Sequence, residues 1–111
     1  MDIQQREHDD IVILQLSGKI IGGPDATSFN DKLHQLIDNG KTKVIADLSQ
    51  VNWMNSSGLG ILISALSTIR NAGGELKIAE TPEKIKNLLT ITKLVNVFPM
   101  YDHVDDAIAS F

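Results

Sequence analysis

The chain lacks cysteine and long apolar runs. With no cysteine among its 111 residues, disulfide bonds, thiolate catalysis and thiolate metal ligands are excluded, and nothing argues for an oxidising compartment. The longest unbroken aliphatic run, residues 11–14, is far short of the ~20 apolar residues that span a bilayer. Charged residues in the first ten positions leave no room for a signal-peptide apolar region. We therefore expect a cytoplasmic protein without membrane insertion.

Basic residues are outnumbered by acidic ones, ten Lys and Arg against fourteen Asp and Glu, for a formal charge of −4 at pH 7. No basic stripe is present to attract a phosphate backbone, so we expect no nucleic-acid partner. The 42% hydrophobic and 22% charged residues are typical of a globular protein. At roughly 150 residues per domain, the length predicts a single domain over residues 1–111.

Strand and helix signals alternate along the chain. Runs rich in β-branched and other apolar residues predict strands over residues 3–7, 11–16, 43–48, 75–79 and 97–101. Apolar positions at a 3.6-residue period predict four helices, which begin near residues 24, 56, 82 and 103. A loop through Trp53 is expected before the second helix. This order predicts an α/β sandwich with right-handed parallel crossovers.

Capping residues are expected to define the helix ends. Pro24 or Asp25 opens the first helix, and Gly40 closes it in the left-handed conformation. Gly73 stops the second helix. The hydroxyl of Thr81 is expected to cap the third helix, with Pro82 at its first position.

Asp102 is expected to cap the last helix.

Metal ligands and paired catalytic acids are not indicated. His8, His34 and His103 lie on three different predicted elements and lack the paired spacing of a zinc site. The acid pairs Asp9-Asp10 and Asp105-Asp106 are adjacent in sequence, so their side chains diverge on a strand or a helix. Solvated turn and helix-cap acids are the better interpretation, and no metal site is predicted.

No enzyme motif is present. Gly58-Leu59-Gly60 is not a dinucleotide fingerprint, because Ile63 stands where the third glycine is needed. A phosphate-binding loop and a G-x-S-x-G nucleophile elbow are absent, and no base can be nominated for Ser56 or Ser57. We predict no catalytic residues, no cofactor and no enzymatic activity.

The segment over residues 51–60 allows two interpretations. In the first, Ser56 or Ser57 caps the helix, worth ~1 kcal/mol, and Gly58 and Gly60 allow close packing on the sheet. Two glycines in a first turn cost ~1 kcal/mol each relative to Ala, however, so a partner or an anion approaching the bare backbone is the second interpretation.

Trp53 and Met54 lie beside these serines and are open to two readings as well. They are either contact residues for a partner or apolar plugs at the edge of the sheet.

These residues resemble the STAS domain, the fold of bacterial anti-sigma factor antagonists, and the resemblance covers nearly all 111 positions. Asp47-Leu48-Ser49 and then residues 55–60 resemble the strand of that family followed by D-S-S-G-L-G at the start of its second helix. Residues 17–20, S-G-K-I, resemble the S-G-x-[LI] that ends its second strand. The resemblance implies an α/β STAS fold with a mixed β-sheet of four to five strands and about four α-helices.

The resemblance also implies a function. In that family the first serine of the pair is phosphorylated by a partner that is both serine kinase and anti-sigma factor, and a PP2C-type phosphatase reverses it. Ser56 is then the phosphorylation site, and the unmodified monomer or weak dimer binds the anti-sigma factor and frees a sigma factor for transcription. The partner-binding residues implied are Asp25, Trp53, Met54, Asn55, Ser56, Ser57, Gly58, Leu59 and Gly60.

Two positions depart from the family pattern. Asn55 replaces the acid before the serine pair, and Ile21 stands where many members have an acid that the glycine turn here shifts to Asp25. Two other functions stay open: a non-catalytic STAS subunit or regulator of another assembly such as a lipid ABC transporter, motivated by Asn55, and a nucleotide or small-ligand module that uses the bare backbone at Gly58 and Gly60.

Overall fold

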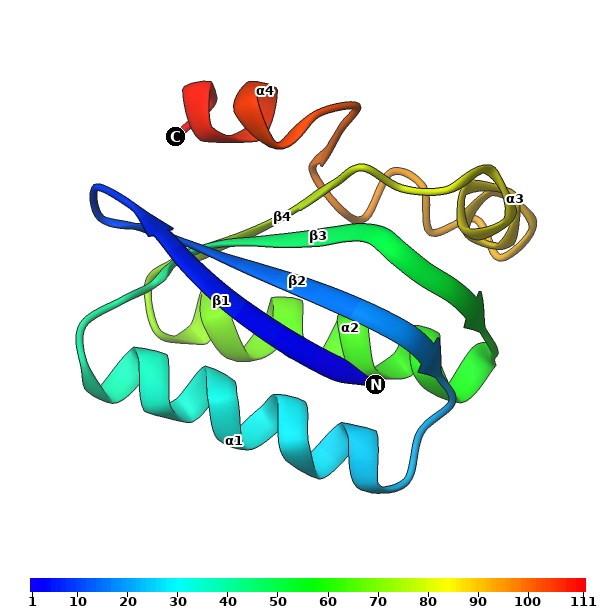
Figure 1. Cartoon of the computed structure of the whole chain (residues 1–111), viewed down its shortest axis with the longest axis horizontal. Helices are drawn as coiled ribbons and strands as arrows, with labels where there is room; N and C mark the ends of the chain where they lie inside the picture. The colour runs from blue at the N-terminus through cyan, green and yellow to red at the C-terminus, as the bar shows by residue number, and fades with distance from the viewer.

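The computed structural model describes residues 1–111 and contains one five-stranded sheet with the spatial order β1-β2-β3-β4-β5 (Figure 1). The strands are β1 (Asp2–His8), β2 (Ile11–Ile20), β3 (Lys43–Met54), β4 (Glu75–Ala79) and β5 (Met100–Tyr101). The helices are α1 (Pro24–Asp38), α2 (Ser56–Asn71), α3 (Glu83–Ile91) and α4 (Val104–Ala109). β1 is antiparallel to β2, while β2 to β5 run parallel. The predicted mixed sheet and four helices are confirmed.

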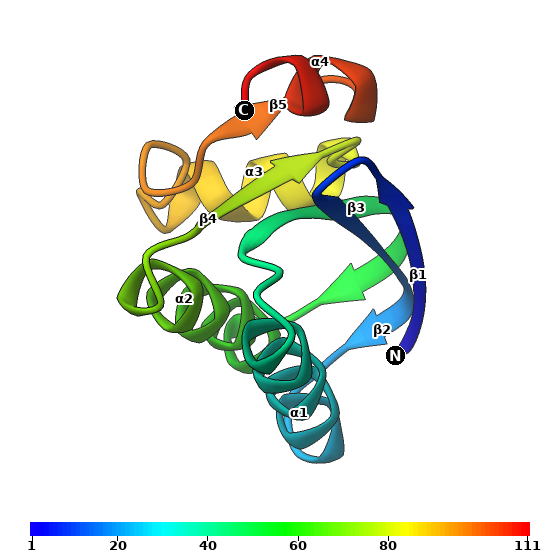
Figure 2. The ribbon, with the colours of Figure 1, turned by 90° about the vertical axis from the view of Figure 1, so that its left-hand side faces the viewer.

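The helices form a layer on each side of the sheet. α1 and α2 cover one face, and α3 and α4 lie on the other side (Figures 1 and 2). Alternating residues of β2 follow this division, as the period of two in a strand requires. Val12 and Leu14 belong to the large core cluster that includes α1 and α2, whereas Ile11 and Ile13 pack in a smaller cluster with α4. None of the helices is long and apolar enough to cross a membrane.

β2 and β3 are both longer than their sequence patterns predicted. Two register shifts, between Gln15 and Ser17 and between Gly18 and Lys19, let the pairing continue to the end of both strands. Such irregularities re-aim a strand while keeping it paired. Trp53 therefore lies on β3, paired with Lys19, and the predicted loop through Trp53 is wrong. The long pair brings the ends of β2 and β3 to the same corner of the molecule.

The predicted helix ends are confirmed only where a proline or a left-handed glycine sets the backbone conformation. Pro24 opens α1, and Gly40 and Gly73 follow α1 and α2 with φ values of 72° and 82°. The predicted serine cap of α2 is wrong, because Asn55 occupies the N-cap. Asn55 precedes the serine pair and accepts with its side chain, so the hydroxyl groups are left free.

The predicted caps of α3 and α4 are also wrong. Pro82 occupies the N-cap of α3, and the Thr81 hydroxyl is buried without a hydrogen-bond partner. His103 precedes α4 and offers no side-chain cap. Instead Glu80, the residue directly after β4, accepts the Val104 N–H at 2.8 Å. Because this carboxylate comes from 24 residues away, Asp102 is not needed as a cap.

Candidate functional site

The start of α2 follows β3 without a loop. Asn55 has an extended backbone, and its Oδ1 accepts the N–H of Gly58 at 2.8 Å. Ser56 and Ser57 are the first two helical residues, and both are exposed. The amides of a first turn have no acceptor within the helix and carry the positive end of its dipole. Two accessible hydroxyl groups therefore stand beside backbone groups that favour negative charge.

Gly58 is required by the packing of α2 on β2. A Cβ atom at this position would lie 1.9 Å from the carbonyl oxygen of Ile20, which is backbone and cannot yield. A Cβ atom at Gly60 would meet nothing within 4 Å, and Gly60 is exposed. Close packing thus explains the first glycine of the pair, whereas the second makes no contact that excludes a side chain.

The turn from β2 to α1 packs against the same helix start. The Asn55 amide nitrogen Nδ2 donates to the Ile21 carbonyl at 3.5 Å, and the Ile21 N–H donates to Asp25 Oδ2 at 3.4 Å. Gly22 has φ of 95°, and a Cβ there would lie 3.0 Å from Ser57 Cβ. Asp25, 31 positions before Ser56 in the printed numbering, thereby joins the helix start through Ile21.

The residues implied as partner contacts divide into exposed and buried ones. Trp53 is 53% exposed, whereas Met54 and Leu59 are 5% and 3% exposed and belong to the core. Of the two neighbours Trp53 and Met54, only Trp53 is thus exposed, and Met54 packs in the core. The remaining members are exposed at Ser56, Ser57 and Gly60, intermediate at Asp25 and Asn55, and buried at Gly58.

The serine hydroxyl groups at this helix start are suited to being modified and not to catalysing a reaction. The serine hydroxyl groups are not paired with a histidine or carboxylate side chain by any hydrogen bond of the structure. No group of three or more His, Asp or Glu side chains could hold a metal ion. An exposed hydroxyl at a helix start can instead receive a phosphoryl group, because the first-turn amides and the dipole accommodate the added charge.

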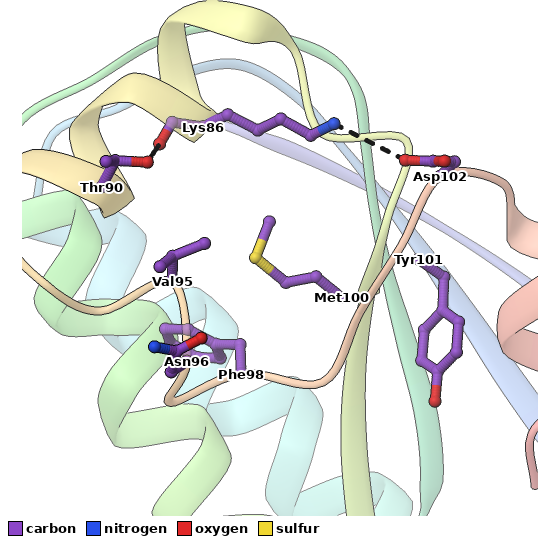
Figure 3. A pocket seen from close by; sticks show the side chains of 8 residues that line it. All are labelled: Lys86, Thr90, Val95, Asn96, Phe98, Met100, Tyr101 and Asp102. Carbon is purple, nitrogen blue, oxygen red and sulfur yellow. Dashed lines mark hydrogen bonds and ion pairs between the residues drawn. The ribbon is translucent and has the colours of Figure 1, made fainter.

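Two hollows lie on the α3 side of the sheet, and the sequence patterns indicated neither. One is a groove of about 350 Å³ between the end of β3 and α3. The other is a cavity of about 400 Å³ between α3 and β5 (Figure 3). Lys86 reaches from α3 to Asp102 across this cavity, with 3.6 Å between ammonium and carboxylate. Both depend on how α3 sits against distant strands, for which the sequence carries no local signal.

Comparison with known proteins agrees with this architecture. The anti-sigma-B factor antagonist of Bacillus subtilis (strain 168) is 29% identical over 97 residues, which are 87% of this chain and 85% of that protein. The crystal structure of a Thermotoga maritima protein proposed to be an anti-sigma factor antagonist superposes with a TM-score of 0.86 at 25% identity, over 97% of this chain and 92% of that one.

The anti-sigma factor antagonist SpoIIAA of Bacillus has the same fold in two forms. Its unphosphorylated and phosphorylated structures each give a TM-score of 0.72, at 15% and 16% identity, over 98% of this chain and 96% and 98% of theirs. The family model described as STAS domain matches residues 2–107. The chain therefore belongs to the STAS domain family.

Proposed function

We propose that this protein is an anti-sigma factor antagonist that is controlled by phosphorylation of Ser56. The unmodified form binds an anti-sigma factor that is also a serine kinase, the phosphorylated form releases it, and a PP2C-type phosphatase restores binding. The observation that carries the proposal is the exposed Ser56 hydroxyl at the first position of α2, with the cap provided by Asn55 instead. The names of the relatives support the class of partner.

Ser56 is favoured over Ser57 as the acceptor. A Cβ atom at Gly22 would lie 3.0 Å from Ser57 Cβ, so the Ser57 side chain stands beside the turn before α1. A phosphoryl group on Ser57 would have to avoid that turn, which Asp25 and Asn55 hold through Ile21. Ser56 is exposed like Ser57, but it lies one residue closer to the end of β3 and away from that turn. It therefore offers the better approach for a kinase.

Phosphorylation should switch the complex without refolding the protein. The group adds about −1.5 to −2 charges at a helix start, where free amides and the dipole stabilise it. A hundredfold loss of partner affinity requires about 2.7 kcal/mol, more than the roughly 0.3–1 kcal/mol of a surface dipole interaction. Steric and like-charge conflict in a desolvated interface supplies the difference. Having the same fold in both forms, SpoIIAA is consistent with this view.

The two other functions left open by the sequence lose part of their motivation. Asn55 differs from the family acid, but here its amide donates to Ile21 while its oxygen caps Gly58, and a carboxylate could perform only the second task. The exchange thus has a local explanation and does not call for a transporter subunit. Likewise, the Ile20 carbonyl accounts for Gly58 without a bound anion.

The test is the affinity of three variants for the serine-kinase anti-sigma factor of the same organism, measured by titration calorimetry. Ser56→Ala should keep the affinity of the unmodified protein, and Ser56→Asp should lower it by at least tenfold. Ser57→Ala is the matched control and should bind and become phosphorylated like the parent protein. Equal binding by the alanine and aspartate variants at position 56, or phosphate found on another residue, would overturn the proposal.

A further inference from the structure

The groove between the end of β3 and α3 has the features of a second contact surface. Its floor is made by Met54 and Ile85, which are 5% and 3% exposed. Its sides carry Trp53 and Ile91, which are 53% and 78% exposed. Large apolar groups that remain in water around a preformed hollow are a sign of an interaction site. Tryptophan in particular is enriched among the residues that contribute most to protein interfaces.

The charge around the groove indicates what its occupant carries. Lys84 lies on the rim, and Lys19 is the register partner of Trp53 on the neighbouring strand. Neither lysine takes part in any ion pair of the structure, and no Asp or Glu lines the groove. On a chain with a net charge of −4, this is a locally cationic surface. It complements an apolar side chain flanked by carboxylates.

The neighbouring cavity makes a useful contrast. Its lysine and its carboxylate, Lys86 and Asp102, already pair with each other across the opening (Figure 3). That cavity therefore offers no uncompensated charge to a ligand. The groove beside Trp53 has Lys84 on its rim, and Lys19 neighbours Trp53 on the next strand; neither lysine has an acidic partner.

The groove is also close along the chain to the proposed phosphorylation site. Trp53 and Met54 line it, and Asn55 and Ser56 follow them directly along the chain. A protein that covers Ser56 can therefore also reach Trp53, three residues earlier in the chain. We propose that the partner contacting Ser56 inserts an apolar side chain, flanked by acidic residues, into the groove formed by Trp53, Leu88 and Ile91. This inference rests on the proposed function. In it, the groove contributes affinity for the partner, and phosphorylation of Ser56 controls whether the partner binds.

The first test uses a defined probe and the full chain. The probe is the blocked peptide acetyl-Glu-Leu-Leu-Glu-amide, and the control probe is acetyl-Lys-Leu-Leu-Lys-amide. Trp53 is the only tryptophan, so its fluorescence and indole NMR signal report directly on the groove. The acidic peptide should shift the signals of Trp53, Leu88 and Ile91 and bind at least threefold more tightly than the basic one. Equal affinity, shifts elsewhere, or no shifts at 10 mM acidic peptide would overturn the inference.

Single substitutions distinguish an effect on peptide binding in the groove from an effect on folding. Ile91→Ser should weaken the acidic peptide about tenfold, and its matched control Val97→Ser, which is 39% exposed outside the groove, should not change it. Lys84→Glu should abolish the preference for the acidic peptide, because the new carboxylate offsets the charge of Lys19. It should still fold, because an acid in the first turn of α3 suits the helix dipole. Unchanged preference in this variant, with its fold intact by NMR, would contradict the charge argument.

Ser56→Asp keeps the two proposals distinguishable. Because the short peptide occupies the groove alone, its affinity should stay within twofold in this variant. Loss of peptide binding in Ser56→Asp would contradict a groove that acts independently of the switch. Conversely, a partner that binds the alanine and aspartate variants of Ser56 equally overturns the phosphorylation switch and leaves the peptide result to stand.

Discussion

The carbonyl oxygen of Ile20 occupies the place that a side chain on Gly58 would need, 1.9 Å from the Cβ position. This contact lets α2 lie directly on the end of β2. It fixes the depth of the helix start, and with it the exposure of Ser56 and Ser57. The position of the proposed phosphorylation site thus depends on the packing of Gly58 against the backbone of Ile20.

Replacing Gly58 should therefore reduce stability. Gly58→Ala forces the helix away from the Ile20 backbone, and such overpacking typically lowers the free energy of unfolding by about 1–3 kcal/mol. Gly60→Ala is the matched control, because a Cβ there meets nothing within 4 Å. It should leave the protein equally stable or up to about 1 kcal/mol more stable. Urea unfolding followed by circular dichroism measures both, and equal losses in the two variants would contradict the packing argument.

Asn55 should contribute to stability through its cap. Asn55→Ala removes the acceptor of the Gly58 N–H and should lower the free energy of unfolding by about 1 kcal/mol. Asn55→Asp keeps the cap and suits the dipole, but loses the donor to the Ile21 carbonyl. It should fall between the parent and the alanine variant. Thermal unfolding, with hydrogen exchange of the Gly58 amide, decides this order, and an aspartate variant weaker than alanine would refute it.

Glu80 should be more important to α4 than Asp102. Glu80→Gln weakens the acceptor of the Val104 N–H at the helix start, and Glu80→Ala removes it, with an expected loss of about 1–2 kcal/mol for the alanine variant. Asp102→Ala breaks only an exposed ion pair with Lys86 and should cost at most about 1 kcal/mol. Chemical denaturation compares the three variants. A greater loss for Asp102→Ala than for Glu80→Ala would restore the cap expected from the sequence.

Lys77 should be replaceable by an apolar residue of similar length. It is 7% exposed on β4, where its ammonium group donates to the Ser110 hydroxyl at 2.6 Å and lies 4.1 Å from the centroid of the Phe111 ring. No carboxylate pairs with it. Because burying a charge is costly, Lys77→Met should match or exceed the stability of the parent protein.

Lys77→Ala is the comparison for that substitution. It leaves a cavity under α4 and should lose about 2 kcal/mol or more. Differential scanning calorimetry of the two variants gives the order. A methionine variant that is as unstable as the alanine variant would mean that the ammonium contacts with Ser110 and Phe111 outweigh the cost of desolvation.

The sequence was most informative where the signal is local. The apolar periods of α1 and α2, the left-handed glycines after these helices and the strand over Glu75–Ala79 were all predicted with near-correct bounds. Caps were least predictable. The acceptor for Val104 comes from Glu80, and the residue that caps α2 stands one position before the serines that the pattern favoured. A cap depends on which acceptor is nearest in space, and that acceptor is not always the nearest hydroxyl in sequence.

By itself the sequence determined the order of strands and helices and the place of Ser56 at the start of a helix, because periodicity, glycine and hydroxyl signals act within a few residues. The motifs at residues 17–20, 47–49 and 55–60 carried the resemblance to the STAS family. The tertiary structure decided that Trp53 is exposed while Met54 is buried, that Asp25 reaches the site through Ile21, and that α3 forms a groove with β3. These features join atoms far apart along the chain. The first two follow from the long β2–β3 pairing, whose register shifts no local pattern indicates, and the groove follows from how α3 packs against the end of β3.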